Sequence, residues 1–220
     1  MKSTRVRYQA RLPVGEGLVR SALVLCLLTG CYTPPNDLEI IRDIPMVASN
    51  ACQSQRTERV ACVIDGDTFD VGQCDPDLGE RFRMLGIDAP ETAKPDAEAD
   101  CWADVAYAEV ERILGGRTVT LTFDEECEGV YGRTLAYVWI TGDDVDAVFS
   151  NADVGELLVE GEFEEPAILL NEYLLLRGFV ELYDEEFAKD LRFISLFSEA
   201  QGIAQAQGAG LWTQCTSDTP

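Results

Sequence analysis

Short alternating or β-branched runs follow one another from residue 58 onward and predict β-strands. Three of them cover residues 59–65, 68–72 and 81–87, with Gly/Asp turns between them. Two more cover residues 117–123 and 131–140. The hydrophobic pattern therefore predicts that strands dominate this part of the chain, with a helical segment before the fourth strand.

Apolar residues at helical spacing predict three helices. The first lies in residues 98–116 and is expected to stop at a Gly-Gly pair. A short, largely buried helix in residues 167–179 is expected to end at Gly178, with Asn171 bonding the backbone and fixing the helix start. The third helix lies in residues 190–210.

The apolar stripes of the first and third helices are expected to pack into the core. The first stripe consists of Trp102, Val105, Ala106, Val110, Ile113 and Leu114. The stripe of the third helix consists of Phe193, Leu196, Phe197, Ala200, Ile203 and Ala204. The tryptophans are also expected in the core, at Trp102, Trp139 and Trp212.

The first 30 residues are typical of a secretory signal peptide. Five basic residues and one acidic residue precede the short apolar run at 21–30, and Cys31 follows. The run is too short for a spanning helix, which needs about 20 residues, so no transmembrane helix is expected in the mature protein. Residues 28–31, "LTGC", resemble the lipobox of bacterial lipoproteins, in which the cysteine is lipidated. The alternative is ordinary signal cleavage, with Cys31 a plain thiol.

The rest of the chain is expected to divide into a tether and one domain. Residues 31–57 mix Pro, Asn, Asp and Ser without periodicity, and the domain covers residues 58–215. An acidic insertion at about 141–166 contains nine acidic residues, and we interpret it as a solvated insertion. The expected location is the bacterial cell envelope, lipid-anchored at Cys31 in the outer membrane or on the extracytoplasmic face, or outside the cell as a secreted protein.

Composition narrows the chemistry. The chain of 220 residues is 46% hydrophobic, which is ample for one sizeable domain. It has no histidine, and this excludes Ser-His-Asp and Cys-His catalysis and imidazole-rich metal sites. The formal charge is −23; removing residues 1–30 leaves 12 basic and 39 acidic residues, a charge of −27.

Six cysteines besides Cys31 lie in the exported part. An even number in an exported chain predicts up to three disulfides, whose 15 possible connectivities the sequence does not resolve. A zinc site is the alternative, and the wide spacings without a CxxC pair disfavour it. The six are Cys52, Cys62, Cys74, Cys101, Cys127 and Cys215.

Carboxylates gather at two turn-like sites beside strands. Asp65 and Asp67 flank a glycine, and Asp88 and Glu91 follow the strand at 81–87. Carboxylates without histidine or a thiolate pair suit a hard cation, calcium first. Solvated turns are the bland alternative, because Asp-Gly-Asp is common in turns.

Two arginines in strand-like surroundings, Arg83 and Arg133, complete the candidate chemistry. A guanidinium bonds phosphate oxygens bidentately, although most strand arginines are ordinary surface residues. A metal, two arginines and a spare carboxylate form a minimal set for water attack on a phosphodiester.

Five strings in this order resemble the staphylococcal nuclease (thermonuclease-like) family from about Val60 to Trp212. They read "VIDGDTF", "RFRMLGIDAPET", "YGRTLAYV", "LLNEYLLLRGF" and "SEAQGIAQAQGAGLW". The resemblance implies an α+β OB-fold, a five-stranded Greek-key barrel with about three packed helices. It also implies calcium-dependent hydrolysis of DNA and RNA that leaves 3′-phosphate ends.

Matching positions carry the family's metal site to this chain. Asp67 and Asp88 match the calcium-binding carboxylates, and Asp65 is expected beside them without binding the ion. Ala89 stands where the family often has threonine. Its backbone carbonyl can still bind calcium, while a side-chain hydroxyl contact is lost.

The catalytic and substrate positions follow in the same way. Arg83 and Arg133 match the two arginines that grip the scissile phosphate, and Glu91 matches the glutamate assigned as general base. Tyr131 matches a tyrosine near the nucleotide phosphate, while Tyr183 is the remaining candidate for stacking on a base. A lysine that helps to bind the nucleotide phosphate is replaced by Val130.

The charge of −27 is unfavourable for holding a polyanion. The expected function is nonetheless a monomeric, calcium-dependent nuclease that acts on DNA or RNA, because the whole catalytic set is present. The alternative is a non-catalytic OB-fold module at the cell envelope that binds a partner through residues 141–166. A third interpretation is a structural lipoprotein held by disulfides.

Overall fold

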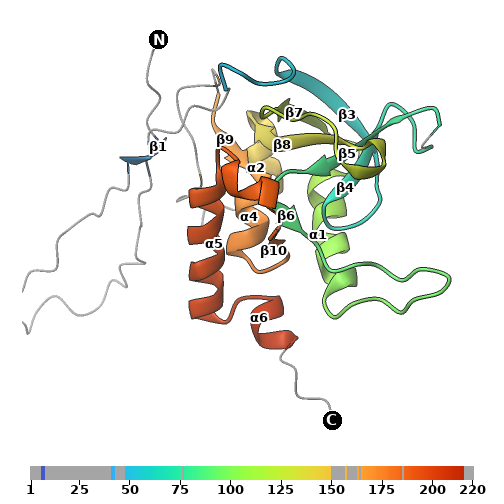
Figure 1. The fold of residues 1–220 in the computed structure, drawn as a ribbon, viewed down its shortest axis with the longest axis vertical. Helices are drawn as coiled ribbons and strands as arrows, with labels where there is room; N and C mark the ends of the chain where they lie inside the picture. The colour runs from blue at the N-terminus through green and yellow to red at the C-terminus, as the bar shows by residue number, and fades with distance from the viewer. Residues whose placement is uncertain are drawn as a thin grey trace, which may run out of the picture.

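A closed five-stranded barrel forms the centre of the domain in the computed structural model (Figure 1). Its strands are β3 (Arg56–Val63), β4 (Thr68–Val71), β5 (Glu80–Met84), β7 (Thr118–Thr122) and β8 (Thr134–Thr141). The structure describes residues 6–7, 41–42, 48–75, 77–149, 157, 163, 165–184 and 186–215. Most of the predicted signal peptide, Cys31 and most of the predicted tether lie outside these residues.

The pairing order closes the barrel. Neighbouring strands run β5-β4-β3-β7-β8 and are antiparallel, and β5 then pairs with β8 in parallel through Phe82↔Thr134. This connectivity is that of an OB-fold, a Greek-key barrel, and the predicted α+β fold class is confirmed. A further strand, β9 (Ala167–Leu169), extends the sheet from β8.

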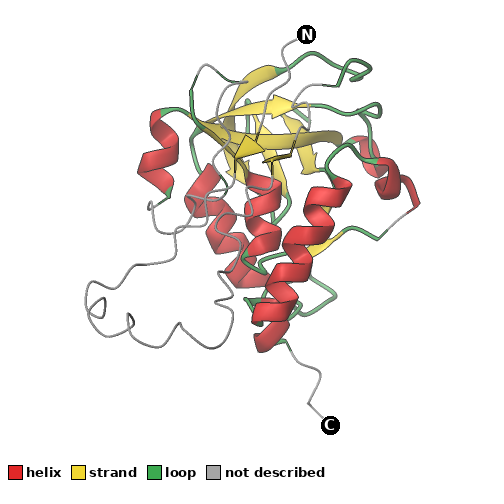
Figure 2. Cartoon of the chain, turned by 90° about the vertical axis from the view of Figure 1, so that its left-hand side faces the viewer, coloured by secondary structure: helices red, strands yellow, loops and turns green. Residues whose placement is uncertain are grey.

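Most of the helices lie below the barrel as Figure 2 draws it. Three helices match the predicted ones, each shorter than the predicted segment: α1 (Ala103–Leu114), α4 (Leu170–Leu176) and α5 (Ile194–Gln207). The described residues also contain α2 (Asp143–Val148) and α6 (Leu211–Gln214), which were not predicted. Two short pairs complete the fold: β6 (Ile87–Asp88) with β10 (Glu181–Leu182), and β1 (Val6–Arg7) with β2 (Ile41–Arg42). None of the described helices is long and apolar enough to cross a membrane.

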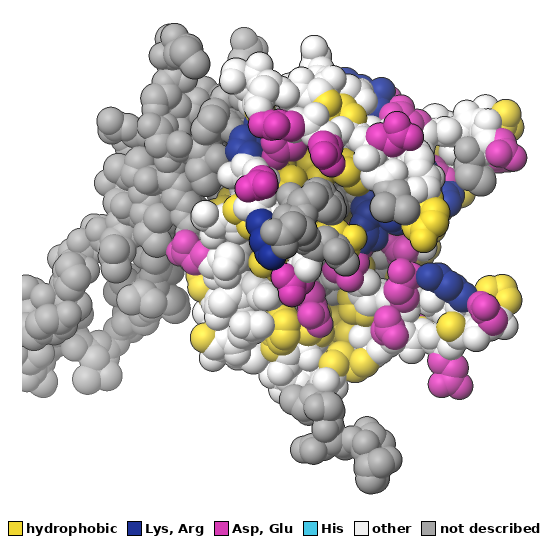
Figure 3. Space-filling model, viewed as in Figure 1, with side chains coloured by type: hydrophobic (Ala, Val, Ile, Leu, Met, Phe, Trp, Pro, Cys, Tyr) yellow, Lys and Arg dark blue, Asp and Glu magenta, His cyan; other side chains and the backbone are white. Residues whose placement is uncertain are grey.

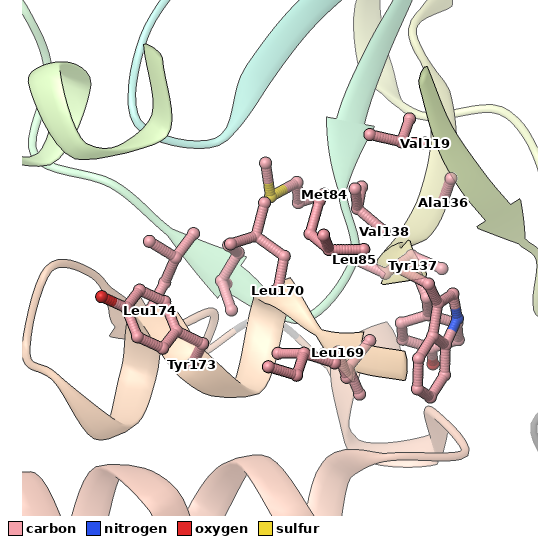
Figure 4. Packing of buried hydrophobic residues seen from close by; sticks show 14 of the residues in the cluster. Met84, Leu85, Val119, Ala136, Tyr137, Val138, Leu169, Leu170, Tyr173 and Leu174 are labelled. Atoms are coloured by element: carbon pink, nitrogen blue, oxygen red, sulfur yellow. The ribbon is translucent and has the colours of Figure 1, made fainter. Parts of the chain in front are cut away.

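The strand β8 is buried from Leu135 to Ile140 because it is covered on both faces. One face lines the barrel, and α4 packs against the other. Figure 4 shows Leu170 of α4 beside Met84. A strand that is buried on both faces has a continuous run of apolar residues in its sequence, without alternation of apolar and polar residues.

Two helix positions predicted to be in the core lie at the surface. The side chains of Val105 and Ile203 are 41% and 38% exposed, whereas Ala106 and Ala204 beside them are buried. A helix advances by about 100° per residue, so a neighbour of a core position can point away from it. Trp102 and Trp212 are only half-buried, and Trp139 alone of the three tryptophans is fully in the core.

Asn171 bonds the backbone as predicted, but it does not cap its helix. Its amide nitrogen donates to the carbonyl of Leu85 at 2.8 Å, and its oxygen accepts from the N–H of Val138 at 3.0 Å. Residue 169 occupies the N-cap position without a side-chain bond. Asn171 therefore joins α4 to the barrel and does not cap the start of the helix. Its position in the sequence did not indicate this role.

The acidic insertion is not a wholly solvated segment. Val145, Val148 and Phe149 are buried, and the Phe149 ring meets Tyr173 edge-on at 4.9 Å. The insertion begins and ends at neighbouring positions, because Gly142 donates its N–H to the carbonyl of Pro166. Its remaining residues 150–156, 158–162 and 164 lie outside the described part.

All six predicted cysteines are paired, in the bridges Cys52–Cys127, Cys62–Cys74 and Cys101–Cys215. The bridge between Cys62 and Cys74 occupies the cysteine–aspartate cluster that the described residues offer to a metal, which removes its thiolates. Cys52 also donates its N–H to the carbonyl of Asp124 at 2.7 Å. The chain is therefore already attached to the barrel at Cys52, whereas the sequence pattern placed the start of the domain at residue 58.

Candidate active site

The turn between β3 and β4 carries Asp65, Gly66 and Asp67 against the first turns of α1. Asp65 accepts a bond from the N–H of Asp67 through Oδ1 at 3.2 Å. A Cβ at Gly66 would lie 2.7 Å from the Cβ of Ala89 and 3.1 Å from that of Ala106. Glycine therefore allows the turn to approach α1 and the residue after β6 this closely.

Asp67 is the buried centre of the cluster. Its Oδ1 accepts from Arg83 Nη1 at 2.8 Å and from the Thr68 hydroxyl at 2.7 Å. Its Oδ2 accepts from the N–H of Ala89 at 2.9 Å. Burial raises the pKa of Asp67 to about 7; Arg83 acts in the opposite direction, and Asp65 adds to the rise. A nearby divalent cation would favour the ionised carboxylate.

Arg83 joins the two predicted metal-binding carboxylates. It lies on β5 directly across from Thr68, so its guanidinium reaches Asp67 through Nη1 and Asp88 through Nη2. The guanidinium also lies 5.5 Å from the ring centroid of Tyr183, which it faces. Tyr183 is held there by its N–H, which donates to the carbonyl of Gly86 at 3.1 Å.

Asp88 lies at the solvent side of the cluster, with 54% of its side chain exposed. It belongs to β6, whose pairing with β10 places Glu181 directly opposite. Two like charges opposite each other on paired strands destabilise the pair, so this edge of the site favours a bound cation.

Glu91 is on the segment between β6 and α1, which projects from the body of the domain (Figure 1). Its carboxylate pairs with the Lys94 ammonium at 2.8 Å, and both side chains are more than half exposed. Its backbone N–H donates to Asp100 Oδ2 at 3.0 Å. Glu91 follows Ala89 by two residues, and Ala89 in turn contacts Asp67.

Arg133 lies just before β8, the strand that pairs with the strand of Arg83. It directly precedes Thr134, which pairs with Phe82 on β5. Its guanidinium lies 5.7 Å from the ring centroid of Tyr131, which is 89% exposed on a 3₁₀ turn at Val130–Gly132. The described residues thus place this Arg–Tyr pair at the start of β8.

The structure brings five of the predicted residues together by direct contact: Asp65, Asp67, Arg83, Asp88 and Ala89. Tyr183 joins them through Arg83. Glu91, Arg133 and Tyr131 lie on other segments: Glu91 pairs with Lys94, and Arg133 lies over the ring of Tyr131.

Three contacts were not anticipated from the sequence. Thr68 bonds Asp67, Lys94 pairs with Glu91, and Asp100 bonds the Glu91 backbone. The spacing of three residues between Glu91 and Lys94 could have indicated the ion pair. The Asp100 contact spans nine residues of irregular loop, and no local pattern signals it.

The donor set fits a divalent hard cation. The carboxylates of Asp65, Asp67 and Asp88 offer only oxygen, which calcium and magnesium prefer. Burial of Asp67 among them gives a carboxylate whose ionised form needs a compensating positive charge. Arg83 supplies that positive charge in this structure, and a divalent cation could supply it at the same carboxylate oxygens.

Acidic side chains are scattered over the visible face of the molecule, among a few separate basic ones (Figure 3). Several of the described arginines are paired with carboxylates, including Arg81 with Asp70 and Arg112 with Glu109. These pairs reduce the positive charge that the surface offers to a polyanion.

Comparison with known proteins gives a consistent result. The family described as "Staphylococcal nuclease homologue" matches residues 81–214, more than half of the chain. A thermonuclease of Staphylococcus intermedius is 41% identical over 83 residues, which cover 38% of this chain and 48% of that protein. A thermonuclease of Staphylococcus hyicus is 35% identical over 118 residues, covering 54% and 65%. An uncharacterized protein of Bacillus anthracis is 29% identical over 140 residues, covering 61% and 62%. The aligned part therefore spans between 48% and 65% of the length of these relatives.

Proposed function

Because the chain belongs to the staphylococcal nuclease homologue family, we propose that it is a calcium-dependent nuclease that hydrolyses phosphodiester bonds of DNA or RNA. The observation that carries the proposal is the contact of Arg83 with both Asp67 and Asp88 at the barrel edge. This contact supports the proposal because it places the guanidinium that would bind phosphate between the two carboxylates that would bind calcium. The thermonucleases among the relatives support the same reaction class.

The chain's own residues have separate roles in this reaction. Asp67, Asp88 and the carbonyl of Ala89 would hold calcium, with Asp65 supporting the turn. Bound calcium supplies positive charge to the phosphate oxygens. Arg83 and Arg133 bind the phosphate and stabilise the charge that develops on it.

Glu91 accepts a proton from the attacking water, whose oxygen forms the new bond to phosphorus. The bond from phosphorus to the 5′-oxygen then breaks, the 5′-oxygen takes up a proton, and the 3′-phosphate remains on the other fragment. Tyr131 and Tyr183 contact the substrate beside the two arginines. The exposed position of Glu91 and Tyr131 is compatible with access to a polymer.

The location is part of the proposal. Residues 1–30 act as a lipoprotein signal peptide, Cys31 is lipidated, and the monomeric domain is held at the cell envelope. The three disulfides support export, because such bonds persist in oxidising compartments. If Cys31 is instead left unmodified, the protein is secreted.

The test is cleavage of single-stranded DNA and RNA by purified protein, with calcium or with a chelator. We expect cleavage in calcium only, and a loss of about 10²- to 10⁴-fold in kcat for Glu91→Gln. Arg133→Ala is expected to reduce cleavage in the same way, and Arg59→Ala on β3 is the matched arginine control. The absence of cleavage by the unaltered protein at millimolar calcium contradicts the proposal.

The formal charge of −27 for residues 31–220 favours one alternative, a non-catalytic module that binds a partner through residues 141–166. This module would be stabilised by calcium without any turnover. Deleting residues 150–162 would then abolish partner capture while the barrel stays folded.

A further inference from the structure

The projecting loop that carries Glu91 is closed at its base by a two-way contact with Asp100. The N–H of Asp100 donates to the carbonyl of Glu91 at 2.9 Å. In return, Asp100 Oδ2 accepts from the N–H of Glu91 at 3.0 Å. The loop between them projects from the domain, so this contact is where the Glu91 backbone is held (Figure 1).

Asp100 is itself attached to α1 and to the end of the domain. Its carbonyl accepts from the N–H of Ala103, the first residue of α1, at 3.2 Å. The next residue, Cys101, forms a disulfide with Cys215, which directly follows α6. Two elements far apart in the sequence therefore fix the position of Asp100.

The same helix also supports the metal-binding turn. Ala106 of α1 lies against Gly66, next to Asp67, so closely that an added Cβ would be 3.1 Å away. One rigid helix thus carries two parts of the site: it supports Asp67 through Gly66, and it reaches Glu91 through Asp100.

We propose that Asp100 is a positioning residue that holds the Glu91 backbone at a fixed place relative to Asp67, and that the Cys101–Cys215 disulfide holds Asp100. Asp100 acts through Glu91 and touches no reacting atom. The inference rests on the proposed function, because it takes Glu91 to be the base that activates water. A displacement of about 1 Å in such a group costs about 10²-fold in rate.

The kinetic test compares three variants in calcium. Asp100→Ala is expected to lower kcat by about 10- to 100-fold while KM and the calcium Kd change by less than about twofold. Asp100→Asn is expected to recover most of kcat, because its amide oxygen still accepts the bond from the Glu91 N–H. Glu98→Ala, on the same loop, is the control and keeps the kcat of the unaltered protein.

A merely structural role predicts a different pattern. Asp100→Ala would then lower Tm and leave kcat unchanged at temperatures well below Tm, and this outcome overturns the proposal. So does equal loss of kcat in Asp100→Asn and Asp100→Ala, which would mean that the charge rather than the hydrogen bond matters.

A second readout does not depend on activity. The amide hydrogen of Glu91 is expected to exchange at least about tenfold faster in Asp100→Ala, and also in the double variant Cys101→Ser/Cys215→Ser, because opening becomes less costly. Unchanged exchange in both variants overturns the positioning role. If the unaltered protein cuts no nucleic acid, the nuclease proposal fails, and the exchange rates still decide whether Asp100 and the disulfide hold Glu91.

Discussion

Arg83 and Asp67 form an ion pair, with Nη1 2.8 Å from Oδ1, and the two side chains are only 13% and 2% exposed. The other arm of the same guanidinium contacts Asp88. One arginine therefore contacts both carboxylates that are proposed to bind calcium. On the proposed function, calcium would compete with Arg83 for these oxygens, and binding of the ion would release the guanidinium toward an anionic group such as a phosphate.

Replacing Arg83 by alanine is expected to have opposite effects on folding and on calcium binding. Without calcium, the variant leaves Asp67 without the guanidinium that favours its ionised form, so the carboxyl is expected to take up a proton near neutral pH. The lost charge-assisted hydrogen bond costs about 1.5–3 kcal/mol of unfolding free energy. Its calcium affinity is expected to rise, because no guanidinium competes for Asp67. Urea unfolding in chelator and calorimetric titration with calcium measure the two effects.

Arg81→Ala is the matched control for this experiment. Arg81 lies two residues away on the same strand and pairs with the buried Asp70 at 2.7 Å. Its loss should also destabilise the fold, but it should leave the calcium affinity unchanged. Weaker calcium binding by Arg83→Ala than by the unaltered protein would contradict competition.

The raised pKa of Asp67 predicts how stability depends on pH in the absence of metal. Burial raises this pKa from 3.8 to about 7, so the folded state holds the proton more tightly than the unfolded state. The resulting stability is fully present below about pH 4 and is lost as pH rises to about 7, by up to about 4 kcal/mol. Asp67→Asn removes this dependence, so its stability relative to the unaltered protein should grow between these pH values in chelator.

Calcium binding should show the complementary dependence. The ion needs the ionised carboxylate, so its affinity is expected to fall as pH drops below about 7, and binding near that pH should release a proton. Titrations in buffers of different ionisation enthalpy measure the released proton. Affinity that is independent of pH between 5 and 8 would exclude Asp67 as the protonated group.

The sequence predicted those parts of the fold and site that depend on local pattern. The strands around Phe69, Phe82 and Val138 follow from short apolar runs between turn residues, and packing of the barrel confirms them. Asp67, Arg83 and Asp88 were recognised because their strings are contiguous and in family order, and the structure brings these three into contact.

The features that were missed depend on contacts between distant segments. The disulfide between Cys101 and Cys215 spans 114 residues of sequence. Six cysteines allow 15 connectivities, and only the folded structure determines which of them forms. Val105 and Ile203 were placed in the core because both are apolar at near-helical spacing. Their exposure follows from which helix face meets the barrel, which a single sequence does not specify.

Gly66 should not tolerate a methyl group. In Gly66→Ala the new Cβ would meet the Cβ atoms of Ala89 and Ala106, and neither belongs to a flexible side chain that could move away. The turn must then shift from α1, so we expect a loss of about 1–3 kcal/mol in unfolding free energy and weaker calcium binding. Chemical unfolding and calcium titration measure the two losses.

Gly202→Ala is the opposite control. Gly202 lies within α5, and no atom lies within 4 Å of an added Cβ. Alanine has the higher helix propensity, so this variant should gain about 0.5–1 kcal/mol without any change in calcium affinity. An unchanged calcium affinity in Gly66→Ala would show that the metal site does not need the close approach to α1.

The acidic surface predicts that salt accelerates cleavage of long substrates. Residues 31–220 carry a formal charge of −27, which repels a polyanion before it reaches Arg83 and Arg133. Raising the ionic strength from about 10 to about 100 mM shortens the screening length from about 30 to about 10 Å and weakens this repulsion. At a fixed saturating calcium concentration, kcat/KM for a long single-stranded DNA is therefore expected to rise over this range. A small phosphodiester with a single negative charge should show little change, because its repulsion is weak at any salt concentration. A steep fall of kcat/KM for the long substrate would mean instead that the arginines and the bound ion dominate its encounter with the site.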